Sequence, residues 1–260
     1  MTAPARGVTR PASTDRGDGQ RRWVGWVALP VVLAVVCLVL WLYVSSQTLD
    51  SIEARSLNAA TIRETLLRHV ALTAVSTVLV VLIAVPLGIV LTRPFTRRVR
   101  GALLTVANIG QAVPTIGLLA LLAVVFFFLG FWAAVVGLVV YAVLPVLRNT
   151  MVGLEEVDDA VLEAGRGMGL SQAQVLRRLE LPLAVPVILA GIRTALVINV
   201  GTATLAAYIN GGGLGTLIVA GFSTNRILVS LTGAILSAVL ALLVDHLAGI
   251  AEDLLKPKGL

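Results

Sequence analysis

The chain has 260 residues, of which 58% are hydrophobic and only 13% are charged. In soluble domains about a quarter of the residues are charged. The low charged fraction and the mean hydropathy of +0.96 therefore exclude a soluble domain and indicate a membrane protein. The formal net charge is +6, but Lys and Arg cluster between apolar runs, which indicates membrane orientation and not nucleic-acid binding. The single cysteine, Cys37, excludes an internal disulfide and a cysteine-based metal cluster.

The N-terminal part divides into a polar tail and an apolar run. Residues 1–22 are rich in Pro, Gly, Ser and Asp, so we expect a disordered cytoplasmic tail. Residues 23–44 exceed the apolar segment of a secretion signal, and no cleavage site follows. We therefore expect an uncleaved spanning helix, with interfacial aromatic residues Trp23, Trp26, Trp41 and Tyr43 at its ends.

Further apolar runs predict five more spans. Residues 101–147 carry no charge and would measure about 70 Å as one helix, about twice the thickness of the hydrocarbon core, so this stretch must turn once. Gly130 lies near its middle. The predicted spans after the first are 70–91, 103–129, 131–147, 183–209 and 227–250. Residues 210–226 form a glycine-rich turn whose apolar second half could dip back into the membrane under protein cover.

Basic residues are concentrated on one side of the predicted spans. That side carries Arg6, Arg10, Arg16, Arg21, Arg22, Arg93, Arg97, Arg98, Arg100, Arg148, Arg166, Arg177, Arg178, Lys256 and Lys258. The other side carries Arg55, Arg63, Arg68 and Arg226. The positive-inside rule then places both termini and residues 148–182 in the cytoplasm, and the glycine-rich turn outside.

Ionisable residues within the spans are few. Asp245 is the only acidic residue in a span, which disfavours proton coupling. Both lysines lie in the C-terminal tail, so the chain has no phosphate-binding P-loop. His69 and His246 have no neighbouring His or Cys, and we expect structural roles and no metal site. Arg193 lies near the membrane midplane, where it would pair internally, face water or snorkel; the sequence leaves these alternatives open.

The cytoplasmic stretch predicts two short helices. Apolar residues recur at helical spacing opposite an acidic face, at Leu154, Val157, Val161 and Ala164. Ser171, with Gln174 three residues later, forms a capping-box signature for a second helix that leads to Pro182. We interpret the pair as a rigid lever; the alternative is a solvated acidic loop that only joins two spans.

A family resemblance rests on this stretch. Glu163, Ala164, Gly165, then Gly169, then Leu179, Leu181 and Pro182 resemble the EAA signature of the membrane subunits of binding-protein-dependent ABC importers. That signature has E-A-A, a Gly four residues after the second Ala, and I-x-L-P. Gly165 stands for the second Ala, which we expect to loosen the helix end, and Leu179 stands for Ile.

The resemblance implies a role for this segment. It would be a coupling helix that sits in a cleft of a cytoplasmic ATPase, with contacts from Glu163, Ala164, Gly165, Met168, Gly169, Leu179, Leu181 and Pro182. Gly169 is expected at a sharp bend where a Cβ would clash.

The resemblance extends from about Ala107 to Gly221. The stretches NIGQAVPTIGLLAL, YAVLPVLRNTMVGLEEVD, LPLAVPVILAGIRTA and GTATLAAYINGGGLG look like the branch that imports osmoprotectants such as glycine betaine, choline and carnitine. The implied fold is an all-α polytopic membrane protein of about six transmembrane helices, a type I ABC importer permease. Its transmembrane domain would be 69–250 with a cytoplasmic EAA loop at 148–182, preceded by the additional helix 23–44 and followed by a cytoplasmic tail, 251–260.

The same resemblance implies the partners. They are a cytoplasmic ABC ATPase dimer that holds ATP and Mg²⁺, a second permease that is an identical copy or a paralogue, an extracytoplasmic solute-binding protein, and the lipid of a bacterial inner membrane. We expect no enzymatic activity and no cofactor in this chain. A permease for another small solute, such as an amino acid, remains the alternative, and an ion-coupled carrier is less favoured.

A translocation path is predicted from prolines and polar residues within the spans. Pro114 and Pro186 are expected to interrupt the third and fifth spans, and the freed backbone groups are tolerated only beside protein or water. The candidate lining residues are Asn108, Gln111, Thr115, Tyr141, Asn199, Thr202 and Tyr208. The alternative is that these polar residues serve helix packing.

Overall fold

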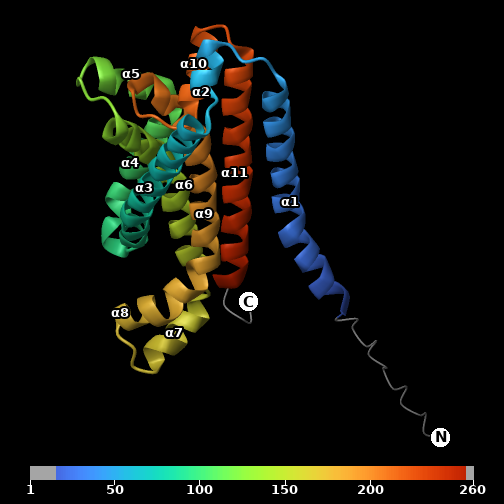
Figure 1. Cartoon of the computed structure of the whole chain (residues 1–260). Helices are drawn as coiled ribbons and strands as arrows, with labels where there is room; N and C mark the ends of the chain where they lie inside the picture. The colour runs from blue at the N-terminus through green and yellow to red at the C-terminus, as the bar shows by residue number, and fades with distance from the viewer. Residues whose placement is uncertain (1–15, 256–260) are drawn as a thin grey trace, which may run out of the picture.

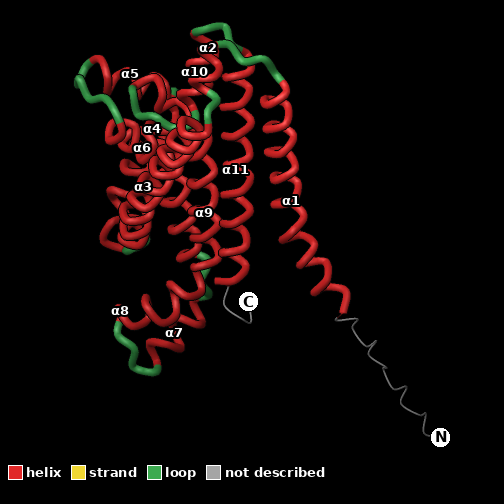
Figure 2. Tube along the Cα trace, in the orientation of Figure 1, coloured by secondary structure: helices red, strands yellow, loops and turns green. Residues whose placement is uncertain are grey.

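The computed structural model describes residues 16–255, which form helices and loops with no strand among them (Figure 2). The predicted tails at 1–15 and 256–260 lie outside the described residues, whereas 16–22 belong to the first helix. The elements are α1 (Arg16–Ser46), α2 (Ser51–Ser56), α3 (Ala59–Leu91), η1 (Pro94–Thr96), α4 (Arg97–Ala112), α5 (Thr115–Val124), α6 (Phe131–Glu155), α7 (Asp159–Gly167), α8 (Gln172–Val175), the π turn η2 (Leu176–Glu180), α9 (Leu181–Thr202), η3 (Ala203–Ile209), α10 (Gly215–Ser223) and α11 (Ile227–Leu255).

Within the described residues, five helical segments are long and apolar enough to cross a membrane, and the bent pair α4–α5 makes up to six. Helices α3, α6, α9 and α11 form a bundle, and α1 stands outside it beside α11 (Figure 1). Helices α7 and α8 project from one end of the bundle, and α2 and α10 lie at the opposite end (Figure 1). The fold therefore has two distinct polar ends, separated by the length of the apolar helices.

The third predicted span is not one straight helix. Helix α4 ends at Ala112, and α5 begins at Thr115 after a bend of 89°. Pro114 has no N–H to donate and forces the preceding Val113 into an extended conformation, with φ −69° and ψ 127°. The predicted turn at Gly130 is confirmed, because this residue has φ +88° and directly precedes α6.

The expected interruption at Pro186 is wrong. Helix α9 continues through Pro186 to Thr202 and then tightens into the 3₁₀ segment η3. Pro186 lies in the second turn of α9, where its missing N–H removes one hydrogen bond without ending the helix. Helix α6 also runs past the expected end at residue 147, to Glu155.

The bundle core depends on close approach between helices. One buried cluster joins α3, α6 and α9 through Val80, Ala84, Ala142, Val146 and Ala195. Where α9 crosses α6, a Cβ on Gly191 would lie 2.6 Å from Asn149 Cβ and 3.1 Å from the Pro145 carbonyl oxygen. Small residues at such crossings let membrane helices pack closely, because van der Waals contact replaces the hydrophobic effect there.

The glycine-rich turn is an ordered structure with a histidine beneath it. It contains α10, and Gly212 and Gly213 have φ of +85° and +90°. His69 of α3 is fully buried; its Nδ1 accepts from the Leu214 N–H at 3.2 Å. Nε2 therefore carries the proton and donates to the Val200 carbonyl oxygen at 2.9 Å. His69 thus fastens the turn to α3 and α9, which agrees with a structural role.

The α6–α9 crossing makes a testable prediction. Gly191→Ala should lower the free energy of unfolding by about 1–3 kcal/mol, because the added methyl group overpacks the crossing. Gly201→Ala in the same helix is the matched control, since a Cβ there meets no atom within 4 Å. Denaturant unfolding of the purified protein in detergent, followed by tryptophan fluorescence, measures both. Equal changes in the free energy of unfolding for the two substitutions would contradict the close packing at Gly191.

Candidate functional site

Residues 156–182, here called the projecting segment, leave the bundle after α6 and return to it at α9 (Figure 1). Helix α7 starts at Asp159 because the Asp158 side chain accepts from the Ala160 N–H at 2.8 Å. The sequence placed Leu154 in this helix, but Leu154 is a buried residue of α6, and the chain breaks between the two helices. The helical spacing continues across that break, which is why the sequence alone did not show it.

One face of α7 is buried within the projecting segment. Val157, Leu162 and Val175 form a buried cluster, with Leu170 and Leu179 packed against it. Gly165 is buried here, and a Cβ on it would lie 2.5 Å from Leu179 Cδ1. Gly165 therefore does not loosen the helix end as expected; it allows α7 and the π turn to touch.

The other face of α7 is exposed and carries motif residues. Glu163 and Ala164 are exposed, and Met168 is 75% exposed. The two faces divide the predicted coupling residues: Gly165 and Leu179 hold the segment together, whereas Glu163, Ala164 and Met168 present a surface. Leu181, the first residue of α9, packs against the bundle cluster of Leu154, Ala184 and Ile188, and Pro182 is the second residue of this helix.

The bend between α7 and α8 depends on Gly169. This residue has φ +85°, and a Cβ on it would meet no atom within 4 Å. The expected clash is therefore wrong; the requirement is the left-handed backbone, which side chains other than glycine rarely adopt. The predicted capping box is confirmed: the Ser171 N–H donates to Gln174 Oε1 at 2.8 Å, and the Gln174 N–H donates to Ser171 Oγ at 3.4 Å.

An ion pair that the sequence did not predict lies where the projecting segment rejoins the bundle. Glu180, the last residue of the π turn, binds Arg93 at the end of α3, with Nη2 to Oε2 at 2.5 Å and Nη1 to Oε1 at 3.3 Å. A glutamate beside a predicted span was the available signal, but its partner is 87 positions away in the chain. Arg100 of α4 makes a second pair, with Glu155 at the end of α6.

Some of the predicted path residues meet on α4, α5 and α6. Asn108 is exposed, and its Oδ1 accepts from Arg148 Nη2 at 2.7 Å. Gln111 Nε2 donates to the Tyr141 carbonyl oxygen at 3.0 Å. Thr115 is buried at the start of α5. The bend at Pro114 thus brings polar groups of α4 beside α6.

The other predicted path residues lie elsewhere. Asn199 is fully buried, and its Nδ2 donates to Thr77 Oγ1 of α3 at 3.0 Å. Thr202 Oγ1 donates to the Ile198 carbonyl oxygen at 2.7 Å, and Tyr208 in η3 is 58% exposed. In this structure Asn199 therefore serves packing between α3 and α9.

Arg193 pairs internally. Its Nε and Nη2 donate to the two carboxylate oxygens of Asp245 in α11 at 2.6 and 2.9 Å, and Nη1 lies 3.6 Å from Glu252. This ion pair joins α9 to α11. Asp245 is the acidic residue that the sequence places within a span, and Arg193 is its partner.

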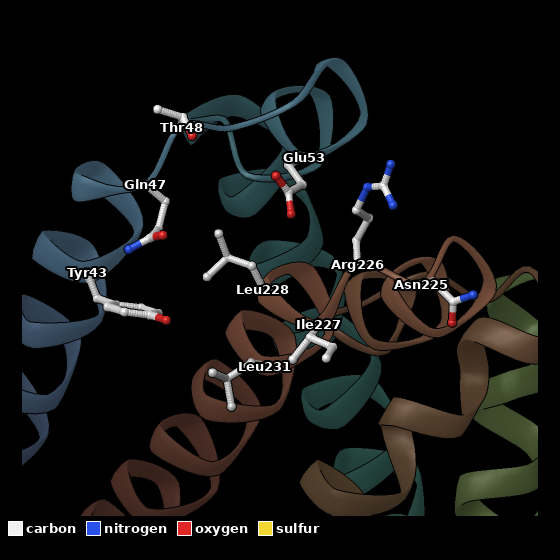
Figure 3. Close-up of a pocket in the computed structure, with 9 residues that line it drawn as sticks. All are labelled: Tyr43, Gln47, Thr48, Glu53, Asn225, Arg226, Ile227, Leu228 and Leu231. Atoms are coloured by element: carbon white, nitrogen blue, oxygen red, sulfur yellow. The ribbon is translucent and has the colours of Figure 1, made fainter.

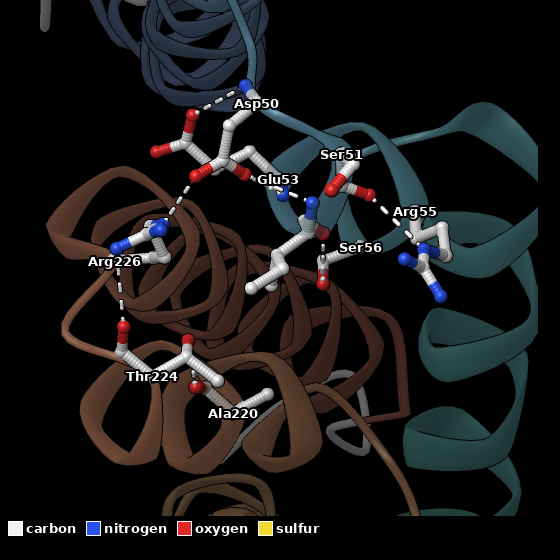
Figure 4. Close-up of polar contacts among 9 residues, drawn as sticks. Asp50, Ser51, Glu53, Arg55, Ser56, Ala220, Thr224 and Arg226 are labelled. Atoms are coloured by element: carbon white, nitrogen blue, oxygen red, sulfur yellow. Dashed lines mark hydrogen bonds and ion pairs between the residues drawn. The ribbon is translucent and has the colours of Figure 1, made fainter.

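A cavity of about 430 Å³ opens at the opposite end of the bundle, between α1, α2 and α11. Tyr43, Gln47, Glu53, Arg226 and Leu231 are among its lining residues (Figure 3). Beside it, Arg226 Nε donates to Asp50 Oδ2 at 2.5 Å, and Asp50 also caps α2 (Figure 4).

The charge of Asp50 supports this end of the bundle. The hydrogen bond from the Glu53 N–H, together with Arg226, holds the pKa of Asp50 below its ordinary value. A lowered pKa means that the contact stabilises the fold above the pKa of the unfolded chain, and that this contribution disappears as pH falls through the folded pKa. The cap and ion pair are therefore present at neutral pH.

Comparison with known proteins gives consistent results. A family model described as "binding-protein-dependent transport system inner membrane component" matches residues 84–258. The chain is 41% identical over 201 residues to the carnitine transport permease protein OpuCD of Listeria monocytogenes, covering 77% of this chain and 89% of that protein. It is 40% identical over 192 residues to the choline transport system permease protein OpuBB of Bacillus subtilis, covering 74% and 87%.

Another relative is matched over its whole length, and chains of solved structures share the fold. The osmoprotectant import permease protein OsmW of Salmonella typhimurium is 35% identical over 216 residues, covering 82% of this chain and 100% of that protein. An inward-facing MetNI methionine ABC transporter chain gives a TM-score of 0.66 at 25% identity, covering 75% of this chain and 96% of that one. A chain of an amino acid ABC transporter gives 0.65 at 17% identity, covering 80% and 99%, which shows the fold alone.

The contact between Gly165 and Leu179 is testable. Gly165→Ala should increase amide hydrogen exchange in α7, because the methyl group pushes Leu179 out of the cluster. Leu179→Val in the same chain removes the clashing carbon and should restore most of the protection. Gly167→Ala is the control, since a Cβ there meets no atom within 4 Å. Unchanged exchange in Gly165→Ala would contradict this packing.

Proposed function

The chain belongs to the family of binding-protein-dependent transport system inner membrane components and is a transmembrane permease subunit of an ABC importer, and we propose that it moves quaternary ammonium osmoprotectants. The candidate solutes are glycine betaine, choline and carnitine. The single observation that carries this assignment is 35–41% identity to permeases named for carnitine, choline and osmoprotectants, over most of both chains. The methionine and amino acid transporters share the fold at only 25% and 17% identity.

We infer that the exposed face of α7 receives the ATPase. Ala164 and Met168 are exposed apolar residues beside Glu163, at the end of a segment that is internally packed. A packed segment can transmit force as one body, whereas a solvated loop cannot. In this proposal a cytoplasmic ATPase dimer binds ATP and Mg²⁺, and this chain contributes no cofactor site.

A second permease would cover α4. This helix buries none of its residues within the chain, and its exposed side carries Val106 and Ile109 together with Asn108. We propose that an identical copy or a paralogue faces α4 and encloses a passage lined by Asn108, Gln111 and Tyr141. Asn199 would contribute to that passage only if α3 and α9 separated.

Selection of the solute would lie mainly with the extracytoplasmic binding protein. A trimethylammonium group is held by several aromatic faces, each contributing roughly 0.5–2 kcal/mol. Aromatic residues make up 5% of this sequence, and Trp41 and Tyr43 stand on α1, away from α4 and α6. The passage therefore offers weak polar contacts from which a solute can leave.

Reconstitution tests the function. Proteoliposomes containing this chain, its ATPase and its binding protein should take up radiolabelled glycine betaine, choline or carnitine only with ATP and the binding protein, because hydrolysis powers release into the lumen. Vesicles with a non-hydrolysable ATP analogue are the control. Uptake of an amino acid and of none of the three compounds would contradict the solute class, and uptake without ATP would contradict the importer mechanism.

The orientation is also a proposal, supported by the basic residues around the projecting segment. Cysteines at Ala60 and Ser223, both exposed at the α2–α10 end, should react with an impermeant maleimide from outside the cell in a Cys37→Ala background. A cysteine at Gln172, exposed in α8, should react only after the membrane is opened. The reverse labelling pattern would place the termini outside.

A further inference from the structure

The Arg93–Glu180 ion pair lies in apolar surroundings at the base of the projecting segment. The Glu180 side chain is 7% exposed. Its neighbours Leu176 and Leu181 pack against the cluster of Leu154, Ala184 and Ile188. A carboxylate in such a place is tolerated only with a cation beside it, so Arg93 determines where Glu180 can lie.

Arg93, two residues beyond the end of α3, is itself held in place by hydrogen bonds. Its Nε donates to the Ile89 carbonyl oxygen at 3.2 Å, while its Nη1 and Nη2 both bind Glu180. Its own carbonyl oxygen accepts from Thr96 Oγ1 at 2.7 Å. All three guanidinium nitrogens are engaged, and the planar fork fixes direction as well as distance. Glu180 is therefore attached to the end of α3 in one orientation.

We propose that the Arg93–Glu180 pair is a positioning element that makes α3 move with the projecting segment during ATP-driven transport. This inference rests on the proposed function of α7 as the ATPase contact. The π turn that ends at Glu180 joins α8 directly to α9, so displacement of α7 and α8 reaches α9 through the backbone. The ion pair transmits the same displacement to α3 without a covalent link. Short π turns are frequent at functional sites, which fits a turn placed at a moving connection.

The contacts higher in the bundle extend this connection. Thr77 of α3 binds Asn199 of α9, and His69 of α3 binds the Val200 carbonyl oxygen. Helices α3 and α9 are thus linked at the projecting segment and again near the opposite end. With the lower link intact, α3 and α9 are joined at both places; without it, the lower end of α9 can move relative to α3 while the upper contacts persist.

A purely structural role makes a different prediction. Buried ion pairs can be replaced by apolar residues of similar size without loss of stability. The double variant Arg93→Met, Glu180→Leu therefore keeps the packing but removes the directional link. The charge-swapped variant Arg93→Glu, Glu180→Arg keeps a directional pair. If the pair only held the fold together, the apolar variant would transport normally.

The experiment compares these two variants with the wild-type complex and with Arg100→Met, Glu155→Leu, a control that removes the more exposed α4–α6 pair. The measurements are ATPase copurification, ATP-dependent glycine betaine uptake in proteoliposomes, and ATP hydrolysed per solute taken up. The apolar variant should copurify with the ATPase and hydrolyse ATP, but its uptake should fall about tenfold, with a matching rise in ATP per solute. The charge-swapped variant should recover most of the uptake, and the control should stay near wild type.

Each other result overturns the inference. Near-normal uptake by the apolar variant would show that the pair is only structural, and its failure to accumulate in the membrane would show that folding requires the pair. An equal loss in the α4–α6 control would show a general effect of removing ion pairs. Absence of ATP-driven uptake by the wild-type complex would instead overturn the proposed function, together with the inference that rests on it.

Discussion

The backbone of this protein can leave helical geometry only where protein groups bind the freed N–H and C=O groups, because hydrocarbon offers none. After α5, the Gly130 N–H donates to the Ile209 carbonyl oxygen. In the glycine-rich turn, His69 and Arg68 bind groups of Leu214 and Gly211. These two irregular segments are therefore also tertiary contacts between distant parts of the chain, and the contacts hold α3, α6 and η3 in their relative positions.

Helix α9 contacts three other helices of the bundle. It touches α3, α6 and α11, begins at the π turn and ends in η3. Charged pairs link its start to α3 through Glu180 and its middle to α11 through Arg193. A helix bound in this way cannot slide alone, so a force applied to the projecting segment is distributed over the bundle.

The sequence predicted those features that depend on neighbouring residues. Hydropathy located α1, α3, α6 and α11, and the capping box located the start of α8, because both signals are local. It did not distinguish Pro114, which breaks its helix, from Pro186, which does not. The partners of Arg193 and Glu180 also stayed unknown, since they lie far away along the chain. For the same reason Asn199, which reads as a polar group on a helix face, was not recognised as a buried contact of Thr77.

The two departures from the EAA signature show why positions should be considered together. Taken singly, Gly165 in place of Ala weakens a helix, and Leu179 in place of Ile is neutral. In the structure they touch, and a Cβ at position 165 would lie 2.5 Å from Leu179 Cδ1. The space left by the missing Cβ of Gly165 is occupied by Leu179, so the two residues act together in this packing. The projecting segment is thus packed internally around these two positions, and it can act as a rigid body although its sequence differs from the signature at both of them.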